Sequence, residues 1–204
     1  MRKVEVVPHN PDWQNEFEAE AKRIAAALGD TVVAIHHIGS TAIHGIYAKP
    51  VIDMLVEVRD ITEVDEQSSE MERLGYEVMG EFGIEGRRYF RKDNQGGIRT
   101  HQIHTFAADS PQAKRHLAFR DFMNAHPEEA QKYSELKRKL ATEYPQNIDG
   151  YMDGKDKFIK KTDRRAAQWI ALRTDSKIKR TKEFVATGSE IYHGNLPEGG
   201  REPH

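Results

Sequence analysis

The spacing of hydrophobic positions changes near residue 110. Before this point, β-branched or alternating segments typical of strands lie at residues 31–38, 51–58 and 98–106. After it, apolar side chains recur at the helical period of about 3.6 residues within residues 111–124, 127–140 and 149–172. We therefore predict an α+β fold, in which a mixed sheet flanked by helices is followed by a C-terminal helical bundle.

Further elements complete the N-terminal half. A helix begins at Pro11, carries an apolar stripe that includes Trp13 and Phe17, and ends at Gly29. Another helix is expected at residues 60–74, and strands at 3–7, 76–79 and 87–92, the last in a hairpin with 98–106. The predicted organisation is an α/β core at 1–108, a helical region packed on it at 109–174, and a tail or peripheral arm at 175–204.

A carboxylate interrupts the second apolar strand. Side chains alternate along a strand, so Asp53 shares one face with Leu55 and Glu57, whereas Ile52 and Met54 belong to the opposite, wholly apolar face. Burying a charge is costly unless the charge is paired, hydrogen-bonded or bound to a metal. Asp53 is therefore the first candidate for a functional residue.

A Gly39–Ser40 turn precedes this strand at an interval that suits phosphate chemistry. Glycine permits a close backbone approach, and the Ser40 hydroxyl with the following amides, beginning at Thr41, can hold phosphate oxygens. Asp53 could then hold a Mg²⁺ ion that bridges those oxygens, while Lys49 adds a positive charge. The alternative is an ordinary strand–turn–helix in which Ser40 caps the helix.

The predicted hairpin is rich in arginine. Arg87 and Arg91 lie on its first arm, and Arg99 lies at the start of the second. These guanidinium groups could form a clamp for phosphate or carboxylate. They could equally be charges that protect an exposed edge strand against pairing.

The second arm of the hairpin carries His101 and His104, which a regular strand places on opposite faces. One of them could join Asp53 in binding a divalent metal, and an imidazole ligand favours Mn²⁺ or Zn²⁺ over Mg²⁺. A structural role is the alternative for each histidine. Lys155 lies on the last predicted helix, from which it could reach a triphosphate or simply face solvent.

Four segments resemble, in the same order, the motifs of the GrpB-like family of predicted nucleotidyltransferases. They are HIGSTAIHGIYAKPVIDMLVEV, RTHQIHTF, FRDFMNAHPEEAQKYSELKRKLA and YMDGKDKFI, within residues 3–172. The resemblance implies the fold of the DNA polymerase β superfamily, with catalytic roles for Ser40 and Asp53 and with His104 on the arm that carries the superfamily's third acid. Two positions depart from the pattern: His44 replaces the family's usual proline, and Leu55 replaces the superfamily's second carboxylate.

Three functions fit these residues. The first is a metal-dependent enzyme that moves a nucleoside monophosphate from a nucleoside triphosphate to an unknown acceptor. The second is a non-catalytic nucleotide- or phosphate-binding module of the same fold, which the missing acid at Leu55 favours. The third is a metal- and histidine-dependent phosphoesterase that uses His101 or His104 with Asp53.

Composition limits the classes of partner and the cellular location that we expect for the protein. The 204 residues include 31 Lys and Arg against 33 Asp and Glu, so the net charge of −2 provides no general attraction to nucleic acid. Cysteine is absent, which excludes disulfides and thiolate metal sites. No apolar run reaches the ~20 residues that span a bilayer, and Met1 leads into a charged segment unlike a signal peptide. We expect a cytoplasmic protein without a membrane partner.

Overall fold

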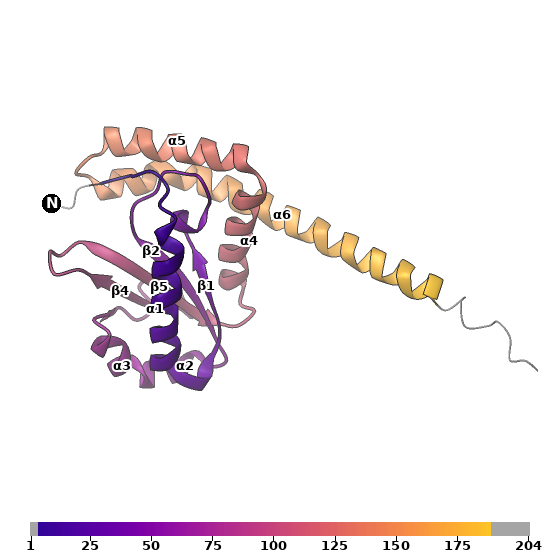
Figure 1. Cartoon of the computed structure of the whole chain (residues 1–204), viewed down its shortest axis with the longest axis horizontal. Coiled ribbons are helices and arrows are strands. Elements are labelled where there is room, and N and C mark those ends of the chain that lie inside the picture. Colours follow the sequence, from indigo (N-terminus) through magenta and orange to yellow (C-terminus); the bar gives the residue numbers. More distant parts are fainter. Residues whose placement is uncertain (1–3, 189–204) are drawn as a thin grey trace, which may run out of the picture. The chain divides into compact units, whose positions relative to one another are not determined.

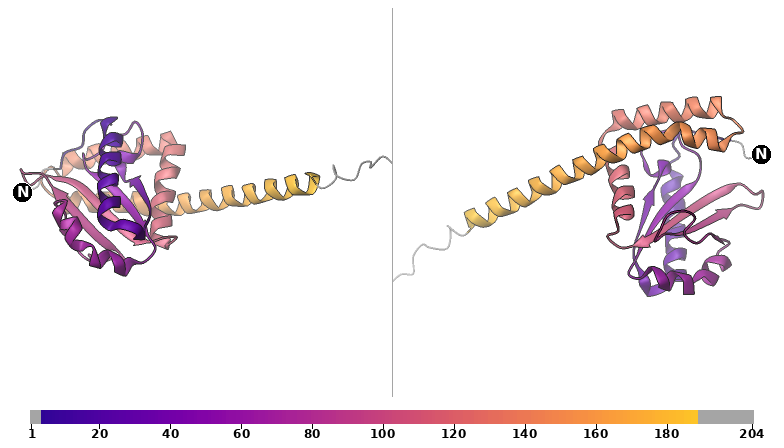
Figure 2. Two further views of the ribbon diagram at one scale, coloured as in Figure 1. Left: turned by 60° about the horizontal axis from the view of Figure 1, so that its bottom comes forward. Right: turned by 180° about the vertical axis from the view of Figure 1, so that it is seen from behind.

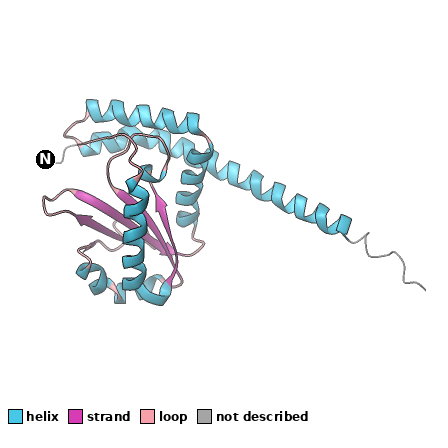
Figure 3. Cartoon of the chain, viewed as in Figure 1, coloured by secondary structure: helices cyan, strands magenta, loops and turns pink. Residues whose placement is uncertain are grey.

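A five-stranded mixed sheet forms the centre of the protein, which a computed structural model describes over residues 4–188 (Figure 3). Its strands are β1 (Val32–Ile38), β2 (Ile52–Val58), β3 (Glu77–Val78), β4 (Arg88–Asp93) and β5 (Arg99–Ala107), in the order β1-β2-β5-β4-β3. Strands β2 and β5 run parallel, and the other neighbours run antiparallel. The helices are α1 (Asp12–Leu28), α2 (Ile61–Glu66), α3 (Ser68–Arg73), α4 (Pro111–Ala125), α5 (Pro127–Glu143) and α6 (Ile148–Gly188). The predicted mixed sheet flanked by helices is confirmed.

The chain divides into two compact units, residues 1–167 and 168–204. The first contains all five strands and the first half of α6. In the second, α6 continues from Gln168 to Gly188, and the Arg173 guanidinium lies 4.5 Å from the centre of the Trp169 ring. No helix among the described residues combines the length and the apolar character required to cross a membrane.

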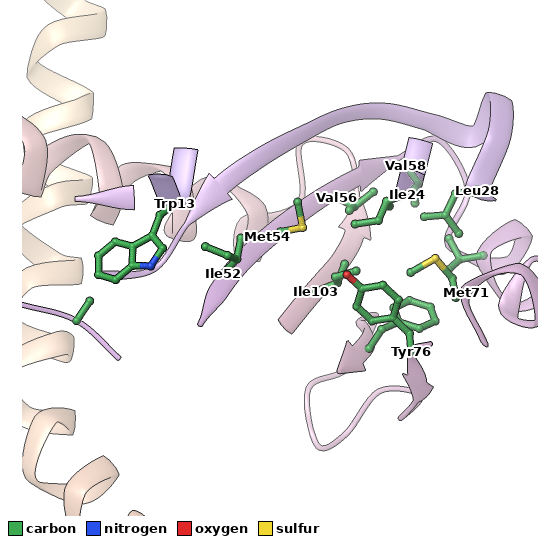
Figure 4. Packing of buried hydrophobic residues seen from close by; sticks show 13 residues of the cluster. Trp13, Ile24, Leu28, Ile52, Met54, Val56, Val58, Met71, Tyr76 and Ile103 are labelled. Carbon is green, nitrogen blue, oxygen red and sulfur yellow. The ribbon is translucent and has the colours of Figure 1, made fainter. Parts of the chain in front are cut away.

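The main core lies on the face of the sheet that α1 covers (Figures 1 and 4). The side chains of Ile52, Met54, Val56 and Val58 point from β2 into this cluster, where they meet Ile24 and Leu28 of α1. The strict alternation of β2 explains this arrangement, because every second side chain of a strand emerges on the same face. The apolar face predicted for residues 52–58 is the buried core face.

The other face of the sheet carries the candidate site. Leu55 packs here with Ile38, Phe106 and Ala113, and so joins β2 to helix α4. Helix α5 and the first part of α6, residues 148–167, lie across the end of the sheet where β1 ends and β2 begins (Figure 1; Figure 2 gives the reverse view). This end of the sheet therefore receives side chains from both strands and from the late helices.

Close packing brings α6 against α5. A Cβ atom added to Gly154 would lie 2.4 Å from Cδ2 of Leu140, so the two helices approach more closely here than a larger residue would allow. Tyr151, one turn before Gly154, is consequently 1% exposed and packs with Val4 and Leu140. The same helical face then presents Lys155 to the interior.

Several elements differ from the sequence-based prediction. The segment expected as an edge strand contributes only a single bridge, between Val7 and Ala48. The helix predicted at 60–74 is two short helices, separated at Gln67. Helix α6 continues beyond Leu172 into the segment predicted as a tail, while residues 189–204 lie outside the described residues.

Candidate functional site

The turn after β1 packs directly on Asp53. Gly39 has φ +69° and ψ −167°, a conformation that side-chain-bearing residues rarely adopt. A Cβ atom at this position would lie 2.3 Å from Oδ2 of Asp53 and 2.8 Å from its Cβ. Glycine is thus required twice, by the backbone angle and by the contact with the carboxylate.

Hydrogen bonds hold this turn on the side that faces the protein interior and helix α4. The Thr41 hydroxyl donates to the Val51 carbonyl at 3.2 Å and accepts a hydrogen bond from Nε2 of His37 at 2.9 Å. Asn124 of α4 donates to the Ala42 carbonyl at 3.0 Å. Thr41 is buried, so its hydroxyl holds the turn in place, whereas the adjacent Ser40 faces a cavity.

A cavity of about 340 Å³ opens in front of Ser40 and Asp53. Its apolar lining includes Ile38, Phe119, Met152 and Ile159, and its polar lining includes Gln102, His104, Arg115, His116 and Tyr133. The strand register places Asp53 opposite Gln102, so both side chains lie on the same face of adjacent strands. The cavity therefore joins an apolar compartment to a polar end at Asp53.

Tyr133 of α5 links the late helices to the turn. Its hydroxyl shares a hydrogen bond with the Ser40 hydroxyl, and burial raises the pKa of Tyr133 to about 12. The phenol therefore stays protonated at neutral pH. Ser40 is held by a buried neutral partner and remains available to a ligand in the cavity.

Three lysines lie near Asp53. Lys137 of α5 is 1% exposed and Lys155 of α6 is 8% exposed, while Lys49, just before β2, is partly exposed. All three positive charges act to lower the pKa of Asp53. Burial nevertheless dominates and raises the pKa of Asp53 to about 6.

Burial also depresses the pKa of two of these lysines. Removal from water lowers the pKa of Lys137 to about 7 and that of Lys155 to about 8, because the charged ammonium loses hydration. The Lys137 ammonium, Nζ, is buried without a hydrogen-bond partner among the described residues. Such an arrangement costs free energy in the empty protein and is typical of a functional site.

Each buried lysine lies over a tyrosine one helical turn before it. The Lys137 ammonium is 4.6 Å from the centre of the Tyr133 ring, and the Lys155 ammonium is 4.6 Å from that of Tyr151. These contacts partly compensate the lost hydration. The sequence signal was the repeated Tyr-x-x-x-Lys spacing, which places both residues on one helical face. Sequence reasoning selected Lys155 and overlooked Lys137.

The histidines of β5 separate onto the two faces. His104 lines the cavity, where its Nδ1 accepts a hydrogen bond from Arg87 at 3.3 Å and its ring lies 5.3 Å from that of His116. Burial lowers the pKa of both His104 and His116 to about 3, so both are neutral. His101 lies on the opposite face, near Tyr76 and Glu20, and the sheet therefore separates it from Asp53.

The three hairpin arginines have protein partners. Arg91 donates to both carboxylate oxygens of Glu77 at 2.5 and 2.8 Å, and Arg99 is paired with Asp93. A register shift between Lys92 and Asp93 breaks the regular alternation of this hairpin, and it places Arg99 opposite Asp93.

Arg87 donates to the carbonyls of Glu81 and Phe82. Neither Arg87 nor the other two hairpin arginines line the Asp53 cavity. The arginine that does so is Arg115, which is paired with Asp163 at 3.1 Å and which sequence reasoning did not select.

The residues around Asp53 do not fit a metal ion held by the protein. Among the described residues, Asp53 is the one carboxylate in the cavity lining, and Leu55, two residues further along the same face of β2, is fully buried in an apolar cluster. Glu57 is paired with His36 at 2.9 Å. Residues 4–176, whose side chains are described, contain no group of three acidic or histidine side chains arranged as metal ligands. The three lysines whose charges act on this carboxylate suit an anion better than a cation when they are protonated.

The described residues define an α+β protein whose cavity contains a glycine turn and a single lining carboxylate, with three lysines nearby, two of which are buried. The family model for the GrpB protein matches residues 3–165, and the chain belongs to this family. The resemblance noted in the sequence is thereby confirmed.

Individual relatives agree with this assignment. The UPF0157 protein YqkA of Bacillus subtilis is 45% identical over 168 residues, which are 82% of this chain but 48% of that protein. The chain thus spans about half the length of this relative. The crystal structure of GrpB from Enterococcus faecalis is 43% identical, covers 81% of this chain and 99% of its own, and superposes with a TM-score of 0.78. Terminal uridylyl transferase 4 from Trypanosoma brucei is 9% identical, covers 82% of this chain and 56% of its own, and has a TM-score of 0.48, too low to support a conclusion.

We predict that Gly39→Ala destabilises the protein by at least about 3 kcal/mol, because the new methyl group meets Asp53 as well as an unfavourable φ. Gly45→Ala is the matched control: its φ is +71°, but nothing lies within 4 Å of the added Cβ. It should cost about 1–2 kcal/mol. Urea unfolding of both variants measures the difference, and equal losses would show that the Asp53 contact is unimportant.

We also predict that Lys137→Met stabilises the empty protein at pH 7 by about 1–4 kcal/mol, since it removes an unpartnered buried charge. The pKa of Lys137 falls from 10.5 in the unfolded chain to about 7 in the fold, so the penalty is full below about pH 7 and disappears above about pH 10.5. The gain should vanish over the same interval. Exposed Lys139→Met on the same helix should show no such gain, and a destabilised Lys137→Met would contradict the argument.

Proposed function

We propose that the Asp53 cavity binds a nucleoside triphosphate and that the protein transfers its nucleoside monophosphate to an acceptor. The observation that carries this proposal is that the Gly39–Ser40 turn packs on Asp53 and that the charges of three lysines act on the same carboxylate. Such a cluster is complementary to a phosphate chain.

The nucleoside would occupy the apolar part of the cavity. A volume of about 340 Å³ is within the range of small-molecule sites, and Phe119 offers a ring against which a base can stack. Gln102 and Arg115 supply polar groups for its edge. The phosphates would then extend past Ser40 toward Lys49 and Lys155.

Transfer requires one proton acceptor and stabilisation of the leaving group. An acceptor hydroxyl oxygen attacks the α-phosphorus, the bond from this phosphorus to the bridging oxygen of the β-phosphate breaks, and pyrophosphate leaves. Asp53 would take the hydroxyl proton, and its pKa of about 6 suits this role near neutral pH. The lysine charges would stabilise the pyrophosphate as it departs.

A non-catalytic nucleotide-binding module is the second candidate. It is favoured by the single carboxylate of the cavity and by the apolar burial of Leu55. The third candidate, a histidine- and metal-dependent phosphoesterase, has less support. His101 lies on the far face of the sheet, and Nδ1 of His104 already accepts a hydrogen bond from Arg87.

We predict that the wild-type protein transfers label from an α-³²P nucleoside triphosphate and that Asp53→Asn abolishes transfer but not binding. The reason is that the amide keeps the shape of the carboxylate but cannot accept the proton. The assay tests each of the four nucleotides, with Mg²⁺, Mn²⁺ or EDTA, against candidate acceptors that include the protein itself.

Asp153→Asn, at an exposed position of α6, is the control and should retain wild-type transfer. Binding without any transfer of label would select the binding module. Absence of nucleotide binding under all conditions would refute both of these candidates.

A further inference from the structure

We infer that the three lysines take the place of a protein-held divalent metal, so that the phosphate chain binds without Mg²⁺ or Mn²⁺. This inference rests on the proposed binding of a nucleoside triphosphate and specifies how its phosphates are neutralised. It differs from the metal-dependent site that the polymerase β resemblance implies. Charge, geometry and the identity of residue 55 support it independently.

The first support is the balance of charge. When all four groups are ionised, the charges of Lys49, Lys137 and Lys155 exceed that of Asp53 by two. A divalent cation bound at Asp53 would lie beside three ammonium groups and would be repelled by each. The same three ammonium groups attract the negative charges of a phosphate chain, and the reduced dielectric of a buried site strengthens this attraction.

The second support is the position of the ammonium groups. Those of Lys49 and Lys155 lie 5.8 and 4.6 Å from the centre of the same Tyr151 ring, so two cations share one small region. The Lys137 ammonium lies over the ring of Tyr133, whose hydroxyl is hydrogen-bonded to Ser40 at the turn. Lys49 is partly exposed and Lys155 is 8% exposed, so both can contact phosphate oxygens, while Lys137 is 1% exposed and acts through its field.

The third support is the scarcity of oxygen ligands. Mg²⁺ requires an octahedral set of oxygens and is usually held by one or two carboxylates together with phosphates. Leu55 fills the second acidic position with an apolar side chain that packs against Ile38 and Phe106. A carboxylate there would be buried without a partner. The apolar side chain at residue 55 and the nearby lysines therefore both favour neutralisation of the phosphates by lysine charge and not by a metal.

Calorimetric titration of the full chain with ATP and with inorganic triphosphate tests the inference. We expect affinity in EDTA to equal that in Mg²⁺ within about threefold, and both probes to bind because the phosphates are the recognised group. Lys155→Met should weaken binding in EDTA at least tenfold, and Lys137→Met by a smaller factor. Lys139→Met, exposed on α5, should have no effect.

The effect of Asp53→Asn on affinity distinguishes phosphates neutralised by lysines from phosphates bound through a metal held by Asp53. If lysines alone neutralise the phosphates, removal of the competing negative charge leaves binding unchanged or tightens it. If Asp53 holds a metal, the variant loses the Mg²⁺-dependent affinity. Binding only in Mg²⁺, lost in Asp53→Asn, would overturn this inference and leave the proposed function intact. Absence of binding in both buffers would refute the proposed function itself.

Discussion

The close contact between Gly39 and Asp53 is the constraint on which the rest of the site depends. Because residue 39 has no side chain, the end of β1 can lie against the carboxylate at the start of β2, and the turn then presents Ser40 to the cavity. Thr41, His37 and Asn124 hold this turn from the core and from α4. The hydrogen bonds do not create the site; they preserve a backbone path that only glycine permits.

Helices α5 and α6 bring buried positive charge near Asp53, and this burial lowers the stability of the protein. Lys137 is buried without a hydrogen-bond partner among the described residues, and the tyrosine one turn earlier compensates only part of its lost hydration. A bound anion would supply the missing interaction and would favour the protonated forms of Lys137 and Lys155, whose pKa values are depressed in the empty protein. Burial of these ammonium groups therefore costs stability that anion binding would restore, a common conflict between stability and function.

Local patterns allowed much of the fold to be predicted, and tertiary packing determined the rest. The alternation along residues 52–58 defined the core face of β2, and the helical spacing after residue 110 located α4, α5 and the start of α6. Helical spacing places Lys137 on the same face of α5 as Tyr133, but its proximity to Asp53 depends on how α5 packs in the fold, which the spacing does not encode. The same limit applies to Arg115, whereas the pairing of Arg99 with Asp93 depends on a register shift that ideal alternation cannot foresee.

The burial of Leu55 links the packing of helix α4 to the number of carboxylates near Asp53. It occupies the same face of β2 as Asp53, yet it is fully buried with Phe106 and Ala113 under α4. A carboxylate at this position would be far from water and would weaken the packing of α4 on the sheet. The helix whose position requires an apolar residue 55 also supplies Arg115 and Phe119 to the cavity. The packing that excludes a second acid thus also builds the wall of the cavity, and positive charge from α5 and α6 would be the available means of neutralising the proposed phosphate ligand.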